Sequence, residues 1–353
     1  MKEISAIGTA YERGRAQAGA ASADVVRNAT VSRVERARAE GVIDAAAESY
    51  LAAQRRFHEG HDPEGLAELA GVAAGFGLSE PDLFAHLHLG TLRDIKGGAS
   101  LIDGCSAWAT ASGPEGPLVV KNRDTSGVQV GVQCVLRHSG PDIVTGQVLS
   151  LGSLGSLAAW SSGINAAGLA VADTQVAVNR HSVGWLRYFL LPRLLARART
   201  VAEAVVLIRS LPHAGGGTLV LADREGATAA VELSATGPVI TQGGPQWRTN
   251  HYTAPHTREE TLGPDGDSIA SNSHRRFDFL ARVLPDQAWT VRKAKALMAT
   301  HPGPDTAPLC QHAESTEGAE TISSVVYSCS IGGMEISDGA PCHNQWQRIE
   351  PCR

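Results

Sequence analysis

The pattern of hydrophobic residues changes near Gly104, and this change constrains the fold of the 353-residue chain more than any other feature. Before this point, apolar residues recur at helical spacing in segments rich in Ala, Arg and Glu, which predicts a mostly helical region over residues 1–95. After it, short apolar runs alternate with turn residues, which is typical of antiparallel strands. Helices and strands grouped in separate blocks predict an α+β layered fold rather than an alternating parallel sheet.

The region after Gly104 is expected to contain helices as well as strands. Two runs, "CSAWATAS" and "PLVVKNRD", flank the turn "GPEG" and predict a hairpin. A further strand is expected at "TISSVVYSCS". Helical spacing predicts four helices, at "GWLRYFLLPRLLARA", "TVAEAVVLIRSL", "SHRRFDFLARVL" and "VRKAKALMA".

Composition and charge exclude several classes of function. The formal net charge is −5 and Lys and Arg form no dense cluster, so neither nucleic acid nor an anionic membrane is expected as a partner. No run approaches the 18 or so apolar residues that span a bilayer, and the charged start lacks an apolar signal segment. Six cysteines in a chain of this length do not make a disulfide scaffold, so we expect a cytoplasmic protein.

Cys105 is the main candidate for chemistry, because it begins a strand directly after a glycine. The hairpin would bring the polar cluster "KNRD", Lys121 to Asp124, back beside it. A nucleophilic thiol needs a proton acceptor, a group that orients the acceptor, and donors for an oxyanion. Three interpretations are open: a packed thiol, a papain-like Cys/His pair, or an N-terminal nucleophile released by a cut before Cys105.

In the third interpretation the α-amine of Cys105 is the base, since its unperturbed pKa of about 7.7–8.0 suits proton transfer near neutrality. Such a site needs a small residue before the cysteine, a carboxylate for the ammonium and an arginine for the carboxylate. Gly104, Asp124 and Arg276 supply these residue types.

An ordered set of motifs resembles a known family. "DGCSAW", "VVKNRD", "GINAAGLAVADT", "TNHY", "SHRRF", "LCQH" and the closing "TISSVVY…GAPC" are similar to the acyl-coenzyme A:6-aminopenicillanic-acid acyltransferase family. These are N-terminal-nucleophile proteins related to penicillin V acylase and conjugated bile acid hydrolase. The resemblance implies a four-layer αββα sandwich with a helical N-terminal segment.

The resemblance also implies a role for each matching residue. Cleavage between Gly104 and Cys105 would give an α chain, 1–104, and a β chain, 105–353, that remain associated. Cys105 would be the nucleophile, Asp124 would bind its amine, and Asn250 would donate its side-chain amide to the oxyanion. Arg276 falls at the position of an active-site arginine, with Arg275 beside it. The stretch Asp173, Thr174 and Gln175 corresponds to a loop that lends a second oxyanion donor.

One position departs from the relatives' pattern, and one group of residues could suggest a metal. Lys121 stands where the bile acid and penicillin V hydrolases have an arginine, and lysine cannot make the planar two-point contact of arginine. Cys310, His312, Cys342 and His343 fit no zinc-finger or ribbon spacing, so we expect no metal there. No phosphate-binding cluster is apparent and no cofactor is expected.

The sequence therefore predicts an amidohydrolase or acyltransferase that forms a thioester on Cys105 from a small N-acyl substrate, such as an N-acylated amino acid or a secondary metabolite. The alternatives are an acyltransferase that uses acyl-coenzyme A and a non-catalytic binding protein with the same fold. Nothing in the sequence indicates the oligomeric state.

Overall fold

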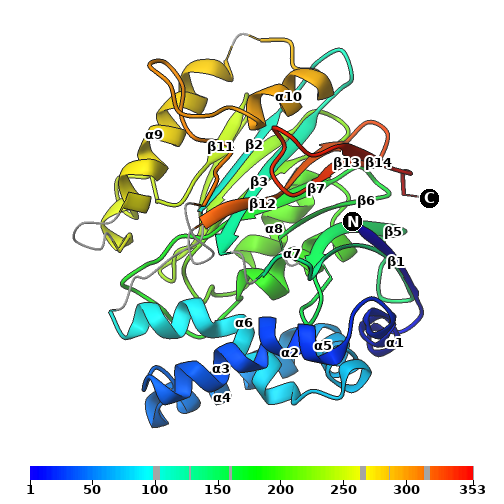
Figure 1. Cartoon of the computed structure of the whole chain (residues 1–353), viewed down its shortest axis with the longest axis vertical. Helices are drawn as coiled ribbons and strands as arrows, with labels where there is room; N and C mark the ends of the chain where they lie inside the picture. Colours follow the sequence, from blue (N-terminus) through cyan, green and yellow to red (C-terminus); the bar gives the residue numbers. More distant parts are fainter. Residues whose placement is uncertain are drawn as a thin grey trace.

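The computed structural model describes residues 1–97, 104–126, 129–158, 161–262, 268–285, 287–313 and 319–352. These residues form two β-sheets that stack face to face, with helices on both outer sides (Figure 1). The layers run helix, sheet, sheet, helix, which confirms the α+β sandwich predicted from the sequence.

The larger sheet has the strand order β1-β4-β5-β6-β7-β8-β9-β10. The β1–β4 pair is parallel and the other neighbours are antiparallel. The strands are β1 (Lys2–Ile7), β4 (Gln133–Ser139), β5 (Gln147–Ser153), β6 (Ser162–Asn165), β7 (Ala170–Thr174), β8 (Thr218–Ala222), β9 (Thr228–Glu232) and β10 (Val239–Gln242).

The smaller sheet is antiparallel, with the order β11-β2-β3-β12-β13-β14. The predicted hairpin at "GPEG" joins β2 to β3, and the predicted strand at "TISSVVYSCS" is β12. The strands are β2 (Gly104–Thr110), β3 (Leu118–Ser126), β11 (Gln246–Arg248), β12 (Ala319–Ser328), β13 (Gly333–Asp338) and β14 (Trp346–Ile349).

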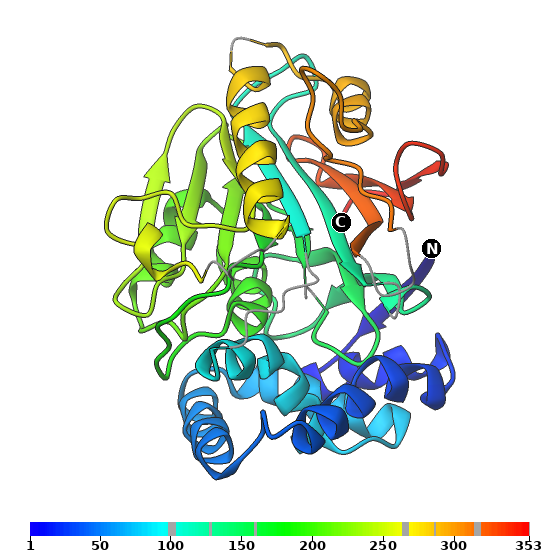
Figure 2. The same cartoon turned by 60° about the vertical axis from the view of Figure 1, so that its left-hand side comes forward.

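Helices cover the two outer faces unequally. Those before Gly104, together with α7 and α8, pack on the larger sheet, while α9 and α10 cover the smaller one (Figure 2). The four helices predicted after Gly104 are confirmed as α7 to α10. The helices are α1 (Ala10–Arg15), α2 (Ala23–Ala29), α3 (Val31–Ala39), α4 (Ala45–His61), α5 (Pro63–Phe76), α6 (Glu80–Ile95), α7 (Arg187–Arg197), α8 (Val201–Arg209), α9 (Ser268–Val283) and α10 (Val291–Met298).

Apolar side chains from both sheets fill the space between them. Ala107 and Val119 of the smaller sheet share this core with Leu149 and Val220 of the larger one. Their strands are covered on both faces, by the other sheet and by helices, so they read as nearly continuous apolar runs in the sequence. Polar residues replace apolar ones at the start of β2 and at the end of β3, and the candidate site lies there.

The N-terminal segment is mostly helical, as predicted, but it also supplies the edge strand β1. Only Ala6 of this strand is buried, so its sequence carries little apolar signal and the strand was not expected. It forms because β4 offers an open edge, with Lys2 opposite Cys134 and Ile7 opposite Ser139. Residues 1–97 are thus built into the larger sheet as well as packed against it.

Within the described residues, every helix is too short or too polar to cross a membrane.

Candidate active site

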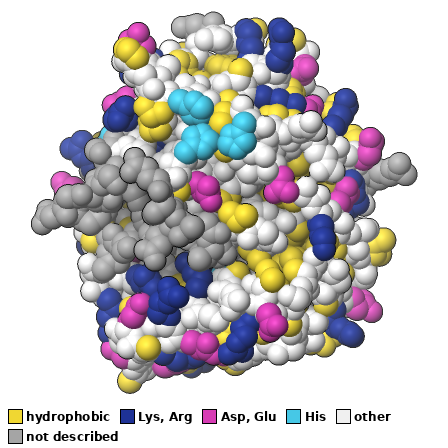
Figure 3. Space-filling view, viewed as in Figure 1, with side chains coloured by type: hydrophobic (Ala, Val, Ile, Leu, Met, Phe, Trp, Pro, Cys, Tyr) yellow, Lys and Arg dark blue, Asp and Glu magenta, His cyan; other side chains and the backbone are white. Residues whose placement is uncertain are grey.

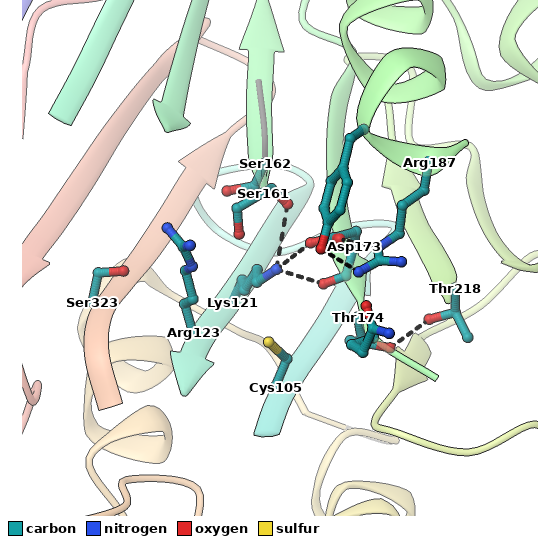
Figure 4. A network of polar contacts seen from close by, with 12 residues as sticks. Cys105, Lys121, Arg123, Ser161, Ser162, Asp173, Thr174, Arg187, Thr218 and Ser323 are labelled. Carbon is teal, nitrogen blue, oxygen red and sulfur yellow. Dashed lines mark hydrogen bonds and ion pairs between the residues drawn. The ribbon is translucent and has the colours of Figure 1, made fainter. Parts of the chain in front are cut away.

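Cys105 is the second residue of β2, opposite Arg123 of β3 and just before the part of β2 that pairs with β11, and it is 6% exposed. Its thiol lies at a pocket with about 430 Å³ of empty space. Figure 4 shows the thiol pointing toward the same region as Lys121 and Asp173. The lining comes from both sides of Gly104: Arg33, Cys105, Lys121, Arg123, Asp124, Thr125, Gln129, Ser161, Asp173, Gln175, Arg187 and Tyr188.

Asp124 lies next to the predicted cleavage position. The β2–β3 register places it opposite Gly104, and a Cβ on Gly104 would stand 3.4 Å from Asp124 Oδ2 and 2.8 Å from Gln311 Nε2. A side chain at position 104 would therefore push the end of the Gln311 side chain away from its place beside Asp124. Asp124 Oδ1 accepts from Thr321 Oγ1 at 2.6 Å, and Oδ2 accepts from Gln311 Nε2 at 2.7 Å.

Burial raises the pKa of Asp124 to about 6, against the opposing influence of Arg276 and of the hydrogen bonds from Thr321 and Gln311. The carboxyl group can therefore change charge at a pH only slightly below neutral, which is unusual for an aspartate.

Asn250 binds the backbone of Cys105. Its Oδ1 accepts from the Cys105 N–H at 3.0 Å and from Arg276 at 2.8 Å, and these two donors fix which amide atom is the oxygen. Its Nδ2 donates to the Gln175 carbonyl at 2.8 Å, which leaves one N–H of the amide for another acceptor. The Asn250 backbone is in turn held by Ser273 Oγ at 2.7 Å.

Arg276 is the buried arginine of the pair on α9. Its side chain is fully buried and donates to the Cys105 carbonyl at 2.6 Å and to Ser106 Oγ at 3.0 Å. Arg275, one residue earlier, is exposed. The helix thus turns Arg276, and not Arg275, toward Cys105.

The stretch Asp173 to Gln175 lies at the end of β7, beside the pocket. Asp173 is the centre of a buried charge network: Lys121 Nζ binds its carboxylate, and its Oδ2 accepts from Arg187 Nε at 2.9 Å (Figure 4). Its backbone N–H donates to Ser161 at 3.0 Å. Thr174 Oγ1 pairs with Thr218 at 2.7 Å. The backbone N–H of Asp173 thus has a partner and Thr174 does not line the pocket, so Gln175 is the candidate for the predicted oxyanion donor.

The surroundings of Cys105 keep its sulfur protonated in the uncut chain. Burial raises the pKa of the thiol, Asp124 and Asp173 raise it further, and Lys121 lowers it. A nucleophilic role therefore needs a nearby base. Among the described residues, the pocket lining contains no histidine, so the papain-like alternative gains no support from the geometry.

Several residues of this site were not found from the sequence. Gln311 and Thr321 lie in the motifs "LCQH" and "TISSVVY", but only the fold brings them to Asp124. The partnership of Lys121 with Asp173 was likewise missed, although both residues belong to quoted motifs. Arg33 had no signal, because an arginine on an amphipathic helix is usually a solvated charge.

The fold and the site together define an αββα protein with a buried cysteine at the start of a central strand. Residues 111–342 match the family described as acyl-coenzyme A:6-aminopenicillanic acid acyl-transferase. The chain belongs to this family of acyl-transferring enzymes. The matched span contains Asp124, Asn250 and Arg276 and begins after Cys105.

The chain is also similar to solved structures of low identity. A mutant of conjugated bile acid hydrolase from Clostridium perfringens matches with 14% identity and a TM-score of 0.43, covering 70% of this chain and 96% of that one. A second variant of that hydrolase matches with 13% identity and a TM-score of 0.41, covering 70% of this chain and 97% of that one. Penicillin V acylase from Agrobacterium tumefaciens matches with 15% identity and a TM-score of 0.38, covering 70% of this chain and 86% of that one. No curated protein sequence matches the chain.

Proposed function

We propose that the chain cuts itself between Gly104 and Cys105 and then acts as an N-terminal cysteine amidohydrolase or acyltransferase. One observation carries the proposal: three polar side chains from distant elements surround the backbone of Cys105. Asn250 accepts its N–H, Arg276 donates to its carbonyl, and Asp124 stands opposite the preceding glycine. A packed structural thiol does not require this arrangement.

The cut is an N-to-S acyl shift followed by hydrolysis. Cys105 Sγ attacks the carbonyl carbon of Gly104, the C–N bond breaks, and the proton of the thiol goes to the departing amine. Water then attacks the thioester, leaving Gly104 with a carboxylate and Cys105 with a free thiol and a free α-amine. Ionised Asp124 stabilises the amine as it gains positive charge.

The same sulfur then serves in turnover. The α-amine accepts the thiol proton while Sγ attacks the substrate amide, and the proton passes to the leaving amine. The remaining N–H of Asn250 and the backbone of Gln175 are the proposed donors to the oxyanion. Water or an amine resolves the thioester and returns the thiol.

The charges of the pocket favour a substrate with an acidic group. Four lining residues are cationic, Arg33, Lys121, Arg123 and Arg187, against the two carboxylates Asp124 and Asp173. Lys121 and Arg187 are engaged with Asp173, whereas Arg123 is hydrogen-bonded to neutral Ser153 at 2.8 Å. An N-acylated amino acid would bring a carboxylate to this cationic wall, and arginine binds carboxylates well.

The two chains are proposed to remain associated after the cut. β1 stays paired along β4, and Arg13 makes two hydrogen bonds to Asp142, at 2.7 and 2.6 Å. Arg33 belongs to the α chain and Cys105 to the β chain, so both chains contribute to the pocket.

Denaturing gels and N-terminal sequencing test the proposal. Wild-type protein should yield two fragments, the larger beginning "CSAW", while Cys105→Ala stays at full length. Cys352→Ala, a change at a half-buried thiol far along the chain, is the matched control and should cut normally. Active wild-type protein with an intact Gly104–Cys105 bond would rule the proposal out.

Intact-mass measurement then tests the chemistry. Exposure to a panel of N-acyl amino acids should give an acyl adduct on the fragment that begins at Cys105. Cleaved protein that forms no adduct and releases no amine with any member of the panel, or with acyl-coenzyme A, would favour a binding protein that has kept the fold.

A further inference from the structure

Four side chains of the types that ligate metals meet on one face of the molecule, and none of them lines the pocket described above. His301, Cys310 and His312 lie between α10 and β12, and Cys342 lies in the loop after β13. Their ligand atoms are all within 4.8 Å of one another. Figure 3 shows histidine side chains gathered on this face.

The three distances from His312 to the other members of the cluster are close to those between ligands of a tetrahedral metal site. His312 Nε2 lies 3.6 Å from Cys310 Sγ, 3.3 Å from Cys342 Sγ and 3.2 Å from His301 Nε2. A zinc ion with Zn–S of about 2.3 Å and Zn–N of about 2.0–2.1 Å places neighbouring ligand atoms roughly 3.3–3.8 Å apart. An imidazole nitrogen has a single proton or a single lone pair, so it cannot satisfy three partners at once. A cation at their centre does.

Hydrogen bonds to the backbone fix the chain segments that carry three of these residues, His301, Cys310 and Cys342. The Cys310 N–H donates to the Thr300 carbonyl at 2.9 Å, and Thr306 Oγ1 donates to the His301 carbonyl at 2.7 Å. Across from them, Asn344 Nδ2 donates to the Ala340 carbonyl at 2.8 Å and closes the turn that carries Cys342.

The exposure of the four side chains allows an ion to enter. Cys310 is buried and Cys342 is half-buried, whereas His301 and His312 are exposed. The two thiols thus lie on the protein side of the cluster, and the two imidazoles face the solvent.

We propose that this cluster binds one Zn²⁺ ion through His301 Nε2, Cys310 Sγ, His312 Nε2 and Cys342 Sγ. Binding releases the two thiol protons, and the two thiolates neutralise the charge of the ion. Thiolate and imidazole ligands select zinc over the hard cations Mg²⁺ and Ca²⁺. Four protein ligands leave no open position, so the site is structural rather than catalytic. The sequence spacing did not indicate it because Cys342 comes from a different strand connection.

His343 completes the surroundings of the ion. Its Nδ1 lies 3.1 Å from Cys342 Sγ, and its ring stacks on that of His312 with centroids 5.6 Å apart. We assign it to a hydrogen bond with the bound sulfur, since groups that contact metal ligands orient them and tune their basicity.

A disulfide between Cys310 and Cys342 is the competing use of the two thiols. It would leave the nitrogens of His301 and His312 facing each other at 3.2 Å with no shared partner. The zinc site accounts for all four residues, and the disulfide accounts for two.

The zinc site would also act on the candidate active site through one residue. Gln311, between the ligands Cys310 and His312, is the donor to Asp124 Oδ2 at 2.7 Å. This consequence rests on the proposed function, whereas metal binding itself does not.

Metal analysis of protein made without a histidine tag tests the site. The host is the uncut Cys105→Ala chain, so that zinc content is read independently of self-cleavage. After chelation and reloading, we expect one zinc per chain, and one Co²⁺ with the visible bands of a tetrahedral site and a thiolate charge-transfer band. Loss of the ion is expected in Cys310→Ser, Cys342→Ser and His312→Ala.

His301→Ala distinguishes loss of metal binding from misfolding, because this side chain is exposed and its removal leaves the buried thiol in place. It should fold, as judged by circular dichroism, yet bind cobalt weakly and with altered bands. Cys352→Ser and His256→Ala are the matched controls and should each keep one ion. Less than half an ion per reloaded chain, cobalt bands unchanged in Cys342→Ser, or a Cys310–Cys342 disulfide in protein purified without reductant would overturn the proposal.

Discussion

Asp124 lies directly opposite Gly104 in the antiparallel β2–β3 pair, and its carboxylate is held there by Thr321 and Gln311. A hairpin alone brings the carboxylate to this position, but its two donors come from the other end of the chain. The pKa of this group, raised to about 6 by burial, makes the arrangement sensitive to pH.

Self-cleavage is predicted to slow as the pH falls through about 6, because protonated Asp124 no longer stabilises the positive charge on the departing amine. Thr321→Val should move this decline to higher pH, since the Thr321 hydrogen bond lowers the pKa of Asp124. The measurement is the rate of fragment formation by freshly translated chain after a pH jump. Ser324→Ala, on the same strand, is the control, and identical profiles for the two variants would contradict the prediction.

Arg276→Lys is predicted to slow cleavage and turnover by about 10- to 100-fold. Lysine keeps the charge but cannot contact the Cys105 carbonyl and Asn250 together, and a hydrogen bond from a charged group contributes roughly 1.5–3 kcal/mol. Arg275→Lys, on the exposed neighbour, should leave both rates unchanged. Equal rates for the two variants, with equal melting temperatures, would remove Arg276 from the site.

Lys121→Met is predicted to destabilise the fold by about 3–5 kcal/mol, because it leaves the buried carboxylate of Asp173 with one cationic partner instead of two. It should also slow alkylation of Cys105 at neutral pH, since Lys121 lowers the pKa of that thiol. Urea unfolding measures the first effect, and peptide mass spectrometry of modified Cys105 measures the second. Lys293→Met, at an exposed position, should change neither quantity, and faster alkylation in Lys121→Met would have the wrong sign.

Arg13→Ala is predicted to weaken the association of the two chains by about 2 kcal/mol, because Arg13 hydrogen-bonds the Asp142 carboxylate across the interface through two nitrogens. The urea concentration that separates the fragments on a sizing column should fall. Arg27→Ala breaks an exposed pair with Glu35 inside the α chain and should have little effect. Separation of wild-type fragments in plain buffer would contradict the proposed association itself.

The hydrophobic pattern predicted the helices well because an amphipathic helix carries its own apolar stripe, and several of these helices also begin with a capping side chain. Thr200 illustrates this: it is the first residue of the predicted helical segment "TVAEAVVLIRSL", and its side chain accepts from the Glu203 N–H at 3.2 Å. β1 was not predicted, because a polar edge strand has no apolar face of its own in the sequence and forms only by pairing with β4.

The candidate site divides in the same way. Neighbours along the chain and across one hairpin, such as Cys105 and Asp124, could be brought together from the sequence alone, because a short turn fixes their register. Asn250 and Arg276 lie 145 and 171 residues from Cys105, and only their motifs suggested a shared site. The motif named Arg276, with Arg275 beside it, and the rotation of α9 shows which of the two is buried.

The sequence by itself determined the layered fold class, the helices, the β2–β3 hairpin and the residue types of the candidate chemistry, because local spacing and turns encode these. The tertiary structure decided which distant side chains converge: Gln311 on Asp124, Asn250 and Arg276 on the Cys105 backbone, and Cys342 on His312. Such contacts depend on how sheets and helices stack, and a linear pattern does not record the distance between segments that meet only after the chain has folded.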